Sequence, residues 1–217
     1  MNKNIVKIIV GILLVLVIGG GIYLSVNNNT NNTNQVQGEN LSNASDENVT
    51  GETTTSNEKP ILIAYFSQTG NTEMMAEEIQ SQIGGDLFKI ETVEEYPSSY
   101  TELTQVAQAE IENGERPELK QAVENIEDYD VIFVGYPIWW HTTPAAVNSF
   151  LESYDLSGKT VVPFCTSGGN DIEETMEAVR NSCPNSNILE GTTISGSSSS
   201  TDAGKEQIRT WLEALDI

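Results

Sequence analysis

The sequence predicts an α/β fold in which helices cover both faces of a parallel sheet. Three observations support this prediction. From residue 60 to residue 217, short apolar runs alternate with longer helical patterns. The apolar runs are continuous rather than alternating, as expected for strands that are buried on both faces. The segment is also long enough to bury a sizeable core.

Each element follows from these patterns in chain order. The expected strands are short runs rich in Val, Ile, Leu and Phe, and the expected helices repeat apolar residues every three or four positions. The predicted strands are residues 61–66, 86–91, 131–135, 160–165 and 187–191. The predicted helices are residues 71–83, 100–112, 145–152, 171–181 and 205–215. The last helix gathers Ile208, Trp211, Leu212 and Leu215 on one face, which we expect to pack on the sheet.

The N-terminal part of the chain has a different character. An apolar run that ends at Leu24 has Lys3 and Lys7 at its start, and a helix of ~20 such residues spans a bilayer. No further Lys or Arg occurs before Lys59, so the positive-inside rule places the following chain outside the cytoplasm. We expect a single-pass signal anchor over residues 1–26, with a cleaved signal peptide as the alternative. The Asn-, Ser- and Thr-rich residues 27–59 are predicted to be a disordered linker to the domain of residues 60–217.

Charge and cysteine content limit the possible functions. The chain has a formal net charge of -22, and residues 1–59 hold three Lys and five acidic residues, which leaves about -20 on the domain. This charge excludes general nucleic-acid binding and suits either a basic partner protein or a solvated surface. Cys165 and Cys183 are predicted to be free thiols, because the helix between them separates them by ~15 Å and a disulfide needs Cα atoms within ~7 Å. The sequence shows no Cys and His grouping typical of a metal site.

The loop after the first strand has the features of a phosphate site. It opens a helix, where backbone N–H groups converge, the helix dipole favours negative charge, and hydroxyls add donors. Its residues are Ser67, Gln68, Thr69, Gly70, Asn71 and Thr72. Because the loop contains no Lys or Arg, it is not a Walker-type nucleotide loop, which requires Gly-Lys-Ser/Thr.

Two further loops follow the third and fourth strands, at the sheet edge where ligands of such folds bind. The first contains Pro137, Ile138, Trp139, Trp140 and His141. Adjacent tryptophans seldom point the same way, so we expect one in the core and one against a planar ligand. The second loop contains Thr166, Ser167, Gly168 and Gly169, which allow a ligand to approach the backbone closely. A plain helix-capping turn is the alternative, but three such loops at one edge favour a ligand site.

Three other side chains near these loops are open to two interpretations. His141 is the single histidine of the chain and is a candidate proton donor to a substrate. A loop histidine bonded to backbone is the favoured alternative, since the sequence shows no second group that would orient the ring. Tyr96 and Tyr100 either cover the site or pack their own loop, and packing is the favoured interpretation.

The three loops, taken in order after their strands, resemble those of the flavodoxin family, in particular members with a Pro-Ile-Trp-Trp loop. The resemblance covers residues 60–217. It implies a three-layer, doubly wound, five-stranded parallel sheet in the order 2-1-3-4-5, and FMN as the cofactor. By this resemblance, residues 67–72 hold the FMN phosphate, and the ring lies between residues 137–141 and 166–169.

One departure from the family affects the expected function. Electron-transfer flavodoxins usually place an aromatic in each ring loop, whereas residues 165–171 contain none, which leaves one flavin face open to a nicotinamide or quinone. We therefore expect a membrane-tethered FMN redox protein that reduces a small acceptor. An FMN-dependent NAD(P)H or quinone oxidoreductase is the expected type of enzyme. The alternatives are a one-electron carrier that docks a redox partner protein through its acidic surface, and a tethered binding module that has lost FMN. A receiver domain and a low-molecular-weight tyrosine phosphatase are excluded, because the first loop lacks their acidic, Cys and Arg residues.

Overall fold

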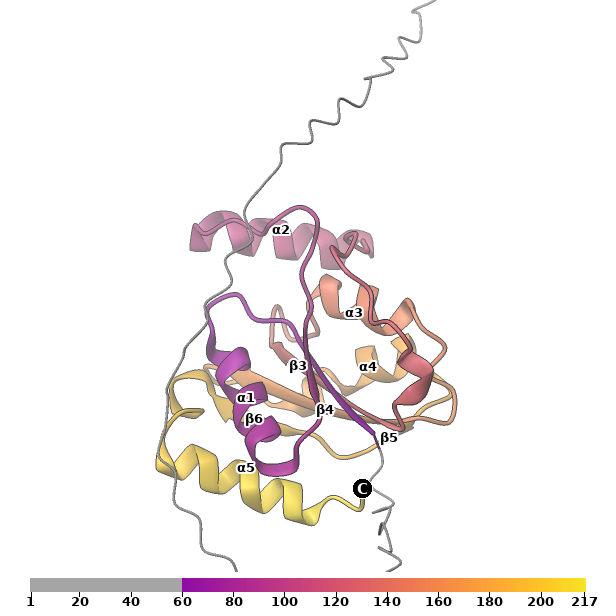
Figure 1. The fold of residues 1–217 in the computed structure, drawn as a ribbon. Helices are drawn as coiled ribbons and strands as arrows, with labels where there is room; N and C mark the ends of the chain where they lie inside the picture. Colours follow the sequence, from indigo (N-terminus) through magenta and orange to yellow (C-terminus); the bar gives the residue numbers. More distant parts are fainter. Residues whose placement is uncertain (1–59) are drawn as a thin grey trace, which may run out of the picture. The chain divides into compact units, whose positions relative to one another are not determined.

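A parallel sheet runs through the middle of residues 60–217, the part of the chain that the computed structural model describes (Figure 1). Its order is β2-β1-β3-β4-β5, every pair is parallel, and β6 also pairs with β4. This confirms the predicted α/β fold and the strand order 2-1-3-4-5. The strands are β1 (Ile61–Tyr65), β2 (Asp86–Lys89), β3 (Val131–Pro137), β4 (Thr160–Ser167), β5 (Asn187–Ile188) and β6 (Thr192–Ser195).

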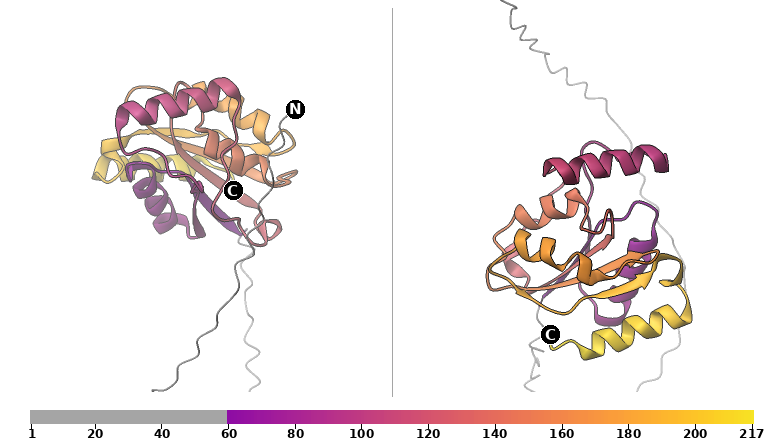
Figure 2. Two further views of the ribbon diagram at one scale, coloured as in Figure 1. Left: turned by 90° about the horizontal axis from the view of Figure 1, so that it is seen from above. Right: turned by 180° about the vertical axis from the view of Figure 1, so that it is seen from behind.

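Helices cover both faces of this sheet. They are α1 (Asn71–Ile83), α2 (Tyr100–Asn113), α3 (Ala145–Glu152), α4 (Met176–Ser182) and α5 (Asp202–Ala214). Short 3₁₀ turns occupy η1 (Ile126–Asp128), η2 (Ile172–Glu174) and η3 (Gly196–Ser198). In Figures 1 and 2, α1 and α5 lie on one face of the sheet and α3 and α4 on the other, while α2 lies farther out, beyond α3.

The two faces of each central strand build two separate cores. In β1, Leu62 and Ala64 belong to the cluster under α3 and α4, whereas Ile63 and Tyr65 belong to the cluster under α1 and α5. The alternation follows from the two-residue period of a strand. The continuous apolar runs of the sequence thus mark strands buried on both sides, as predicted. Gly135 in β3 is also part of this packing, because a Cβ there would lie 2.1 Å from the ring of Phe164.

The fifth strand position differs from the prediction. Instead of one strand at residues 187–191, the chain forms β5, a short break and then β6, which ends at Ser195. The break lies beside Pro163 of β4, between the parts of β4 that pair with β5 and with β6. Proline has no N–H to donate to the ladder, which explains the interruption.

The last helix also begins at Asp202 rather than residue 205, because Thr201 caps it by accepting from the N–H of Gly204 at 3.1 Å.

Two further predictions concern the ends and the thiols of the chain. The predicted membrane segment (1–26) and linker (27–59) lie outside the described residues. Among residues 60–217, no helix is both long and apolar enough to cross a membrane. Cys165 and Cys183 are free, as predicted, and both are buried. Burial raises the pKa of Cys165 to about 12, so this residue is a neutral thiol.

Candidate functional site

A cleft of about 810 Å³ opens at the carboxyl end of the sheet. Its volume lies within the range of ~300–1,000 Å³ that is typical of ligand pockets. The loops after β1, β3 and β4 meet there, together with α2 and the end of β6. The site residues predicted from the sequence that line this cleft are Gln68, Thr69, Asn71, Thr72, Pro137, Ile138, Trp139, Trp140, His141, Thr166, Ser167 and Gly168.

Three other predicted site residues shape the loops rather than line the cleft. Ser67 Oγ accepts a hydrogen bond from the N–H of Gly70 at 3.1 Å. Gly70 itself has a φ of 87°, a left-handed conformation that favours glycine. Gly169 donates its N–H to Ser167 Oγ at 3.1 Å. These contacts form the two turns that bring the lining residues to the sheet edge.

The loop after β1 presents an open helix N-terminus. Gly70 occupies the N-cap of α1, and within the described chain no side chain caps this end. The first N–H groups of a helix have no intrahelical acceptor, and the dipole adds partial positive charge. The buried hydroxyls of Thr72 and Thr166 hydrogen bond to each other at 2.9 Å, which joins α1 to the end of β4. This end of the cleft therefore offers neutral donors for an anion, held in place by the core.

The loop after β3 is a tight turn in a strained conformation. Trp139 and Thr142 exchange backbone hydrogen bonds of 3.1 and 2.9 Å. The residues between them, Trp140 and His141, have φ values of 47° and 63°. Such turns favour Asn-Gly, and left-handed backbone costs other residues roughly 1–2 kcal/mol each. Residues held in such conformations cluster at functional sites, and here both line the cleft.

The two tryptophans divide their roles partly as predicted. Trp139 packs edge-on against Phe66 and Tyr96, with ring centroids 5.2 Å apart in both pairs, and joins the core under α3 and α4. Trp140 is 49% exposed and donates its Nε1–H to the carbonyl of Thr104 in α2 at 3.1 Å. Both rings also line the cleft. Trp139 thus contributes to the site as well as to the core, because it lies where the core borders the cleft.

One wall of the cleft was largely missed by sequence reasoning, which offered only Tyr100 of this wall as a possible cover of the site. Tyr100, Leu103, Thr104 and Ala107 of α2 line it, and Tyr100 is 79% exposed. The favoured interpretation that Tyr100 packs its own loop was therefore wrong, whereas Tyr96 does pack. The spacing i, i+3, i+4, i+7 of the four residues is the signal that would have found this face. After β6, Ser195 and Gly196 also line the cleft, and they were missed because the strand was predicted to end at residue 191.

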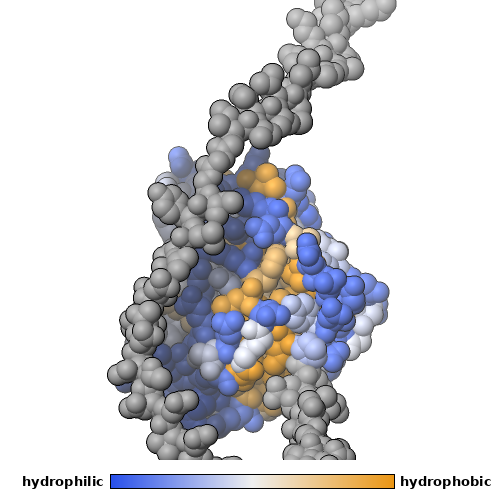
Figure 3. All heavy atoms as spheres, viewed as in Figure 1, coloured by the Kyte–Doolittle hydropathy of each residue, from blue (hydrophilic) through white to orange (hydrophobic). Residues whose placement is uncertain are grey.

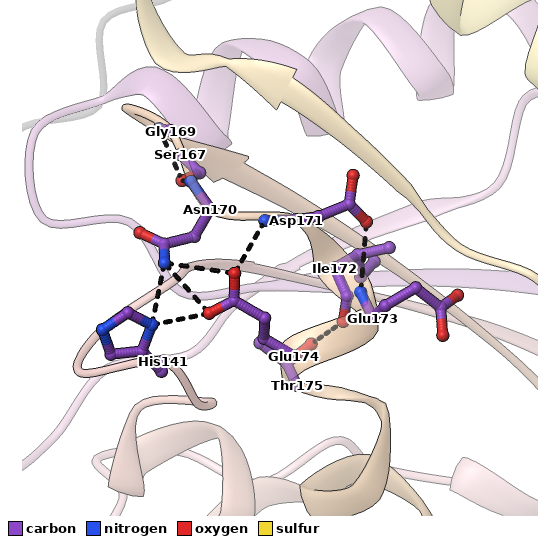
Figure 4. A network of polar contacts seen from close by, with 9 residues as sticks. All are labelled: His141, Ser167, Gly169, Asn170, Asp171, Ile172, Glu173, Glu174 and Thr175. Carbon is purple, nitrogen blue, oxygen red and sulfur yellow. Dashed lines mark hydrogen bonds and ion pairs between the residues drawn. The ribbon is translucent and has the colours of Figure 1, made fainter.

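His141, which lines the cleft, belongs to a network of polar contacts (Figure 4). Its Nδ1 lies 2.6 Å from Glu174 Oε2. Asn170 donates its amide to both carboxylate oxygens of Glu174, at 3.2 and 2.9 Å. Both hydrogen bonds lower the pKa of the Glu174 carboxyl, that with His141 more than that with Asn170. Glu174 is therefore ionised. The interpretation as a backbone-bonded loop histidine was wrong: Glu174, 33 residues away in the sequence, orients the ring.

The comparison with family models identifies the class of protein. A model described as flavodoxin matches residues 60–215. The chain therefore belongs to the flavodoxin family, as its three loops predicted. A flavodoxin of Haemophilus influenzae is 31% identical over 101 residues, which cover 45% of this chain and 44% of that protein. The chain thus matches less than half the length of this relative.

Solved structures extend the likeness over the whole domain. A Bacteroides eggerthii protein assigned as a flavoprotein is 38% identical, with a TM-score of 0.65, over 74% of this chain and 99% of that one. A similar Bacteroides uniformis protein is 29% identical, with a TM-score of 0.62, over 71% and 98% of the two chains. A flavoprotein of Lactobacillus acidophilus, solved in complex with FMN, is 21% identical, with a TM-score of 0.60, over 71% and 99%. This last likeness is one of fold.

Proposed function

We propose that this protein is an FMN-dependent oxidoreductase, tethered to a membrane, that reduces a small acceptor of the quinone class. FMN is the cofactor of this flavodoxin-family chain. The observation that carries the proposal is the cleft, which has an anion-binding helix N-terminus at one end and tryptophans at the other. When bound, FMN supplies the electron chemistry, and the protein supplies binding and orientation.

The residues present fit this cofactor. A phosphate is an anion that the uncapped N-terminus of α1 and the Thr72 hydroxyl can hold without a cationic side chain. A flat ring fits between the aromatic loop after β3 and the loop of Thr166, Ser167 and Gly168 after β4. The hydrogen bond between Thr72 and Thr166 keeps the two ends at a fixed spacing. The cleft thus suits a ligand that is charged at one end and planar at the other.

A small acceptor is favoured by the open wall of the same cleft. The loop after β4 has no aromatic side chain, and α2 borders the space with Tyr100 and Leu103. Tyr100 is largely exposed, so an aromatic surface is available for a second planar molecule beside the flavin site. A nicotinamide or quinone has the size and shape to use such a surface.

A one-electron carrier is the second candidate function. It is favoured by the charge of about -20 on residues 60–217, which would steer a basic redox partner protein to the surface. In Figure 3, hydrophilic residues cover most of the face that is drawn, and apolar residues form a band across its centre, below α2. A module without FMN is disfavoured, because the phosphate loop keeps its open helix N-terminus and its hydroxyls.

The tether is proposed from the sequence. The apolar run before Leu24, its flanking lysines and the long Asn-rich linker support a single-pass anchor, with the flavin domain outside the cytoplasm. Protease treatment of intact cells tests this arrangement. We expect cleavage in the linker to release the domain from cells whose cytoplasmic proteins stay intact. Protection of the domain until the cells are lysed would place it in the cytoplasm.

The activity is tested on the full chain purified in detergent. We expect absorbance bands at ~370 and ~450 nm from bound flavin, which should bleach when NADH or NADPH is added without oxygen. A water-soluble quinone should then restore the bands in a single rapid phase. Bleaching by dithionite but by neither nicotinamide would favour the carrier. A colourless protein that takes up no added FMN would favour the binding module and rule out the redox function.

A further inference from the structure

The network around His141 gives this side chain a defined chemical state. Glu174 is ionised, and a carboxylate can only accept hydrogen bonds. The Nδ1 atom of His141, 2.6 Å from Glu174 Oε2, must therefore carry a hydrogen and donate it. Asn170 approaches the same Nδ1 at 2.9 Å, but this contact joins two donors, and the Asn170 amide hydrogens go to Glu174 instead. The second ring nitrogen, Nε2, is left for a ligand or solvent.

Glu174 is itself held in place by several donors. Besides Asn170, the N–H of Asp171 donates to Oε1 at 3.4 Å, as part of the capping box that starts η2. The two other acidic residues of this turn do not reach the ring: Asp171 accepts from the N–H of Glu173 at 3.2 Å, and Glu173 points away from the ring (Figure 4). Glu174 is thus the charged group that orients His141. Its carboxylate is held by the capping box of η2 and by Asn170.

We propose that His141 is the proton donor to the acceptor reduced in the cleft, with Glu174 and Asn170 as its positioning residues. The inference rests on the proposed function. His141 lines the cleft, and its left-handed backbone holds the ring there. Because the Glu174 carboxylate accepts from Nδ1, the Nε2–H of the protonated ring is the one that is free to be donated. With a side chain 73% exposed, the ring regains its proton directly from water.

The reaction is balanced for a quinone. When bound and fully reduced as its anion, FMN would supply the two electrons and one hydrogen that a quinone takes up as a hydride. The Nε2–H of His141 supplies the remaining proton to the developing hydroquinone oxygen, and the ring becomes neutral imidazole. The quinone thereby becomes the hydroquinone, and one water-derived proton restores the imidazolium. A one-electron oxidant such as ferricyanide takes electrons without a proton and has no use for His141.

The ring state can be measured directly, because the chain has a single histidine. Nitrogen-15 NMR of the labelled full chain, at a pH where the ring is neutral, should show Nδ1 protonated and Nε2 bare. Glu174→Ala should change this tautomer, while Glu173→Gln, which removes a like charge from the same turn without touching the ring, should not. Finding Nε2 protonated in the unmodified protein would overturn the proposal, whatever the activity.

Kinetics separate this inference from the proposed function. His141→Asn keeps a residue that tolerates left-handed backbone but cannot donate a proton in this way. We expect reoxidation of the reduced protein by a water-soluble quinone to slow about 10–100-fold. This is at or below the lower limit of the ~100–10,000-fold typical of general-acid catalysis, because water is a substitute at an exposed site. Reoxidation by ferricyanide should keep its rate. Glu174→Ala should show the same pattern more weakly, and Glu173→Gln should match the unmodified protein.

Each outcome bears on one claim. Equal slowing with both oxidants would show a merely structural role for His141, and no slowing with quinone would also overturn the inference; both results leave the proposed function standing. An unmodified protein that binds FMN and reacts with ferricyanide but with no quinone would instead overturn the proposed function, and the proton donor with it.

Discussion

Helices α1 and α2 border the same cleft but are attached to the protein in different ways. α1 buries Thr72, Met75, Ala76 and Ile79 against the sheet and α5. In α2, only Ala107 and Glu110 are buried. α2 is joined to the rest by polar contacts, from Trp140 to the Thr104 carbonyl and from Tyr96 to Glu110. The end of the cleft at α1 is therefore part of the core, while the wall formed by α2 has few apolar contacts and opens at lower free energy.

The largest expected effect tests this difference in packing. Ile79→Ala in α1 removes a fully buried side chain and should lower the free energy of unfolding by about 2–5 kcal/mol. Val106→Ala in α2 is the matched control, because Val106 is 38% exposed, and it should change stability by less than about 0.5 kcal/mol. Urea unfolding of both variants measures the contrast. Similar losses in the two helices would show that α2 is as firmly packed as α1.

The next prediction concerns the hydroxyl pair that joins the two ends of the cleft. Thr72→Val leaves the buried Thr166 hydroxyl without its partner, which should cost about 1–3 kcal/mol of stability. Adding Thr166→Val replaces both groups by apolar ones of the same shape, so most of that stability should return. FMN affinity, followed by quenching of flavin fluorescence, should remain weakened in the double variant, because the Thr72 donor is still missing. Recovery of affinity together with stability would show that Thr72 does not hold the phosphate.

A smaller effect is expected where α2 contacts the loop after β3. Trp140→Phe keeps an aromatic ring but removes the hydrogen bond to Thr104, which should cost about 0.5–1.5 kcal/mol. We expect faster hydrogen exchange of the α2 amides and unchanged exchange in α1, as measured by mass spectrometry. Unchanged exchange in α2 would mean that this bond does not hold the wall.

The same contrast explains which features the sequence predicted. The bounds of α1 and α3, the strand order and the loop after β1 follow from apolar runs and from a loop that opens a packed helix. The lining face of α2 was missed because its residues are mixed in polarity and face a cleft rather than a core. The bond between His141 and Glu174 joins two loops of different strands, and no local pattern encodes such a contact. The split of the fifth strand depends on Pro163 in its neighbour, which lies far away in the sequence.

The smallest predicted effect uses the buried acid of α2. Glu110 accepts from the hydroxyl of Tyr96 at 2.8 Å, and burial raises the pKa of its carboxyl, with Glu115 adding to the rise. A raised pKa means that the fold favours the protonated form, so this residue costs stability as the pH rises from the ordinary value of a glutamate, about 4.3, through its folded value. Glu110→Gln keeps an acceptor for Tyr96 and carries no charge. We expect the variant to be more stable at pH 7 by less than about 1 kcal/mol, the size of one net hydrogen bond, and the difference to vanish below the ordinary pKa. Urea midpoints of both proteins across this pH range measure the effect, and a difference that grows on acidification would mean that the ionised form of Glu110 stabilises α2.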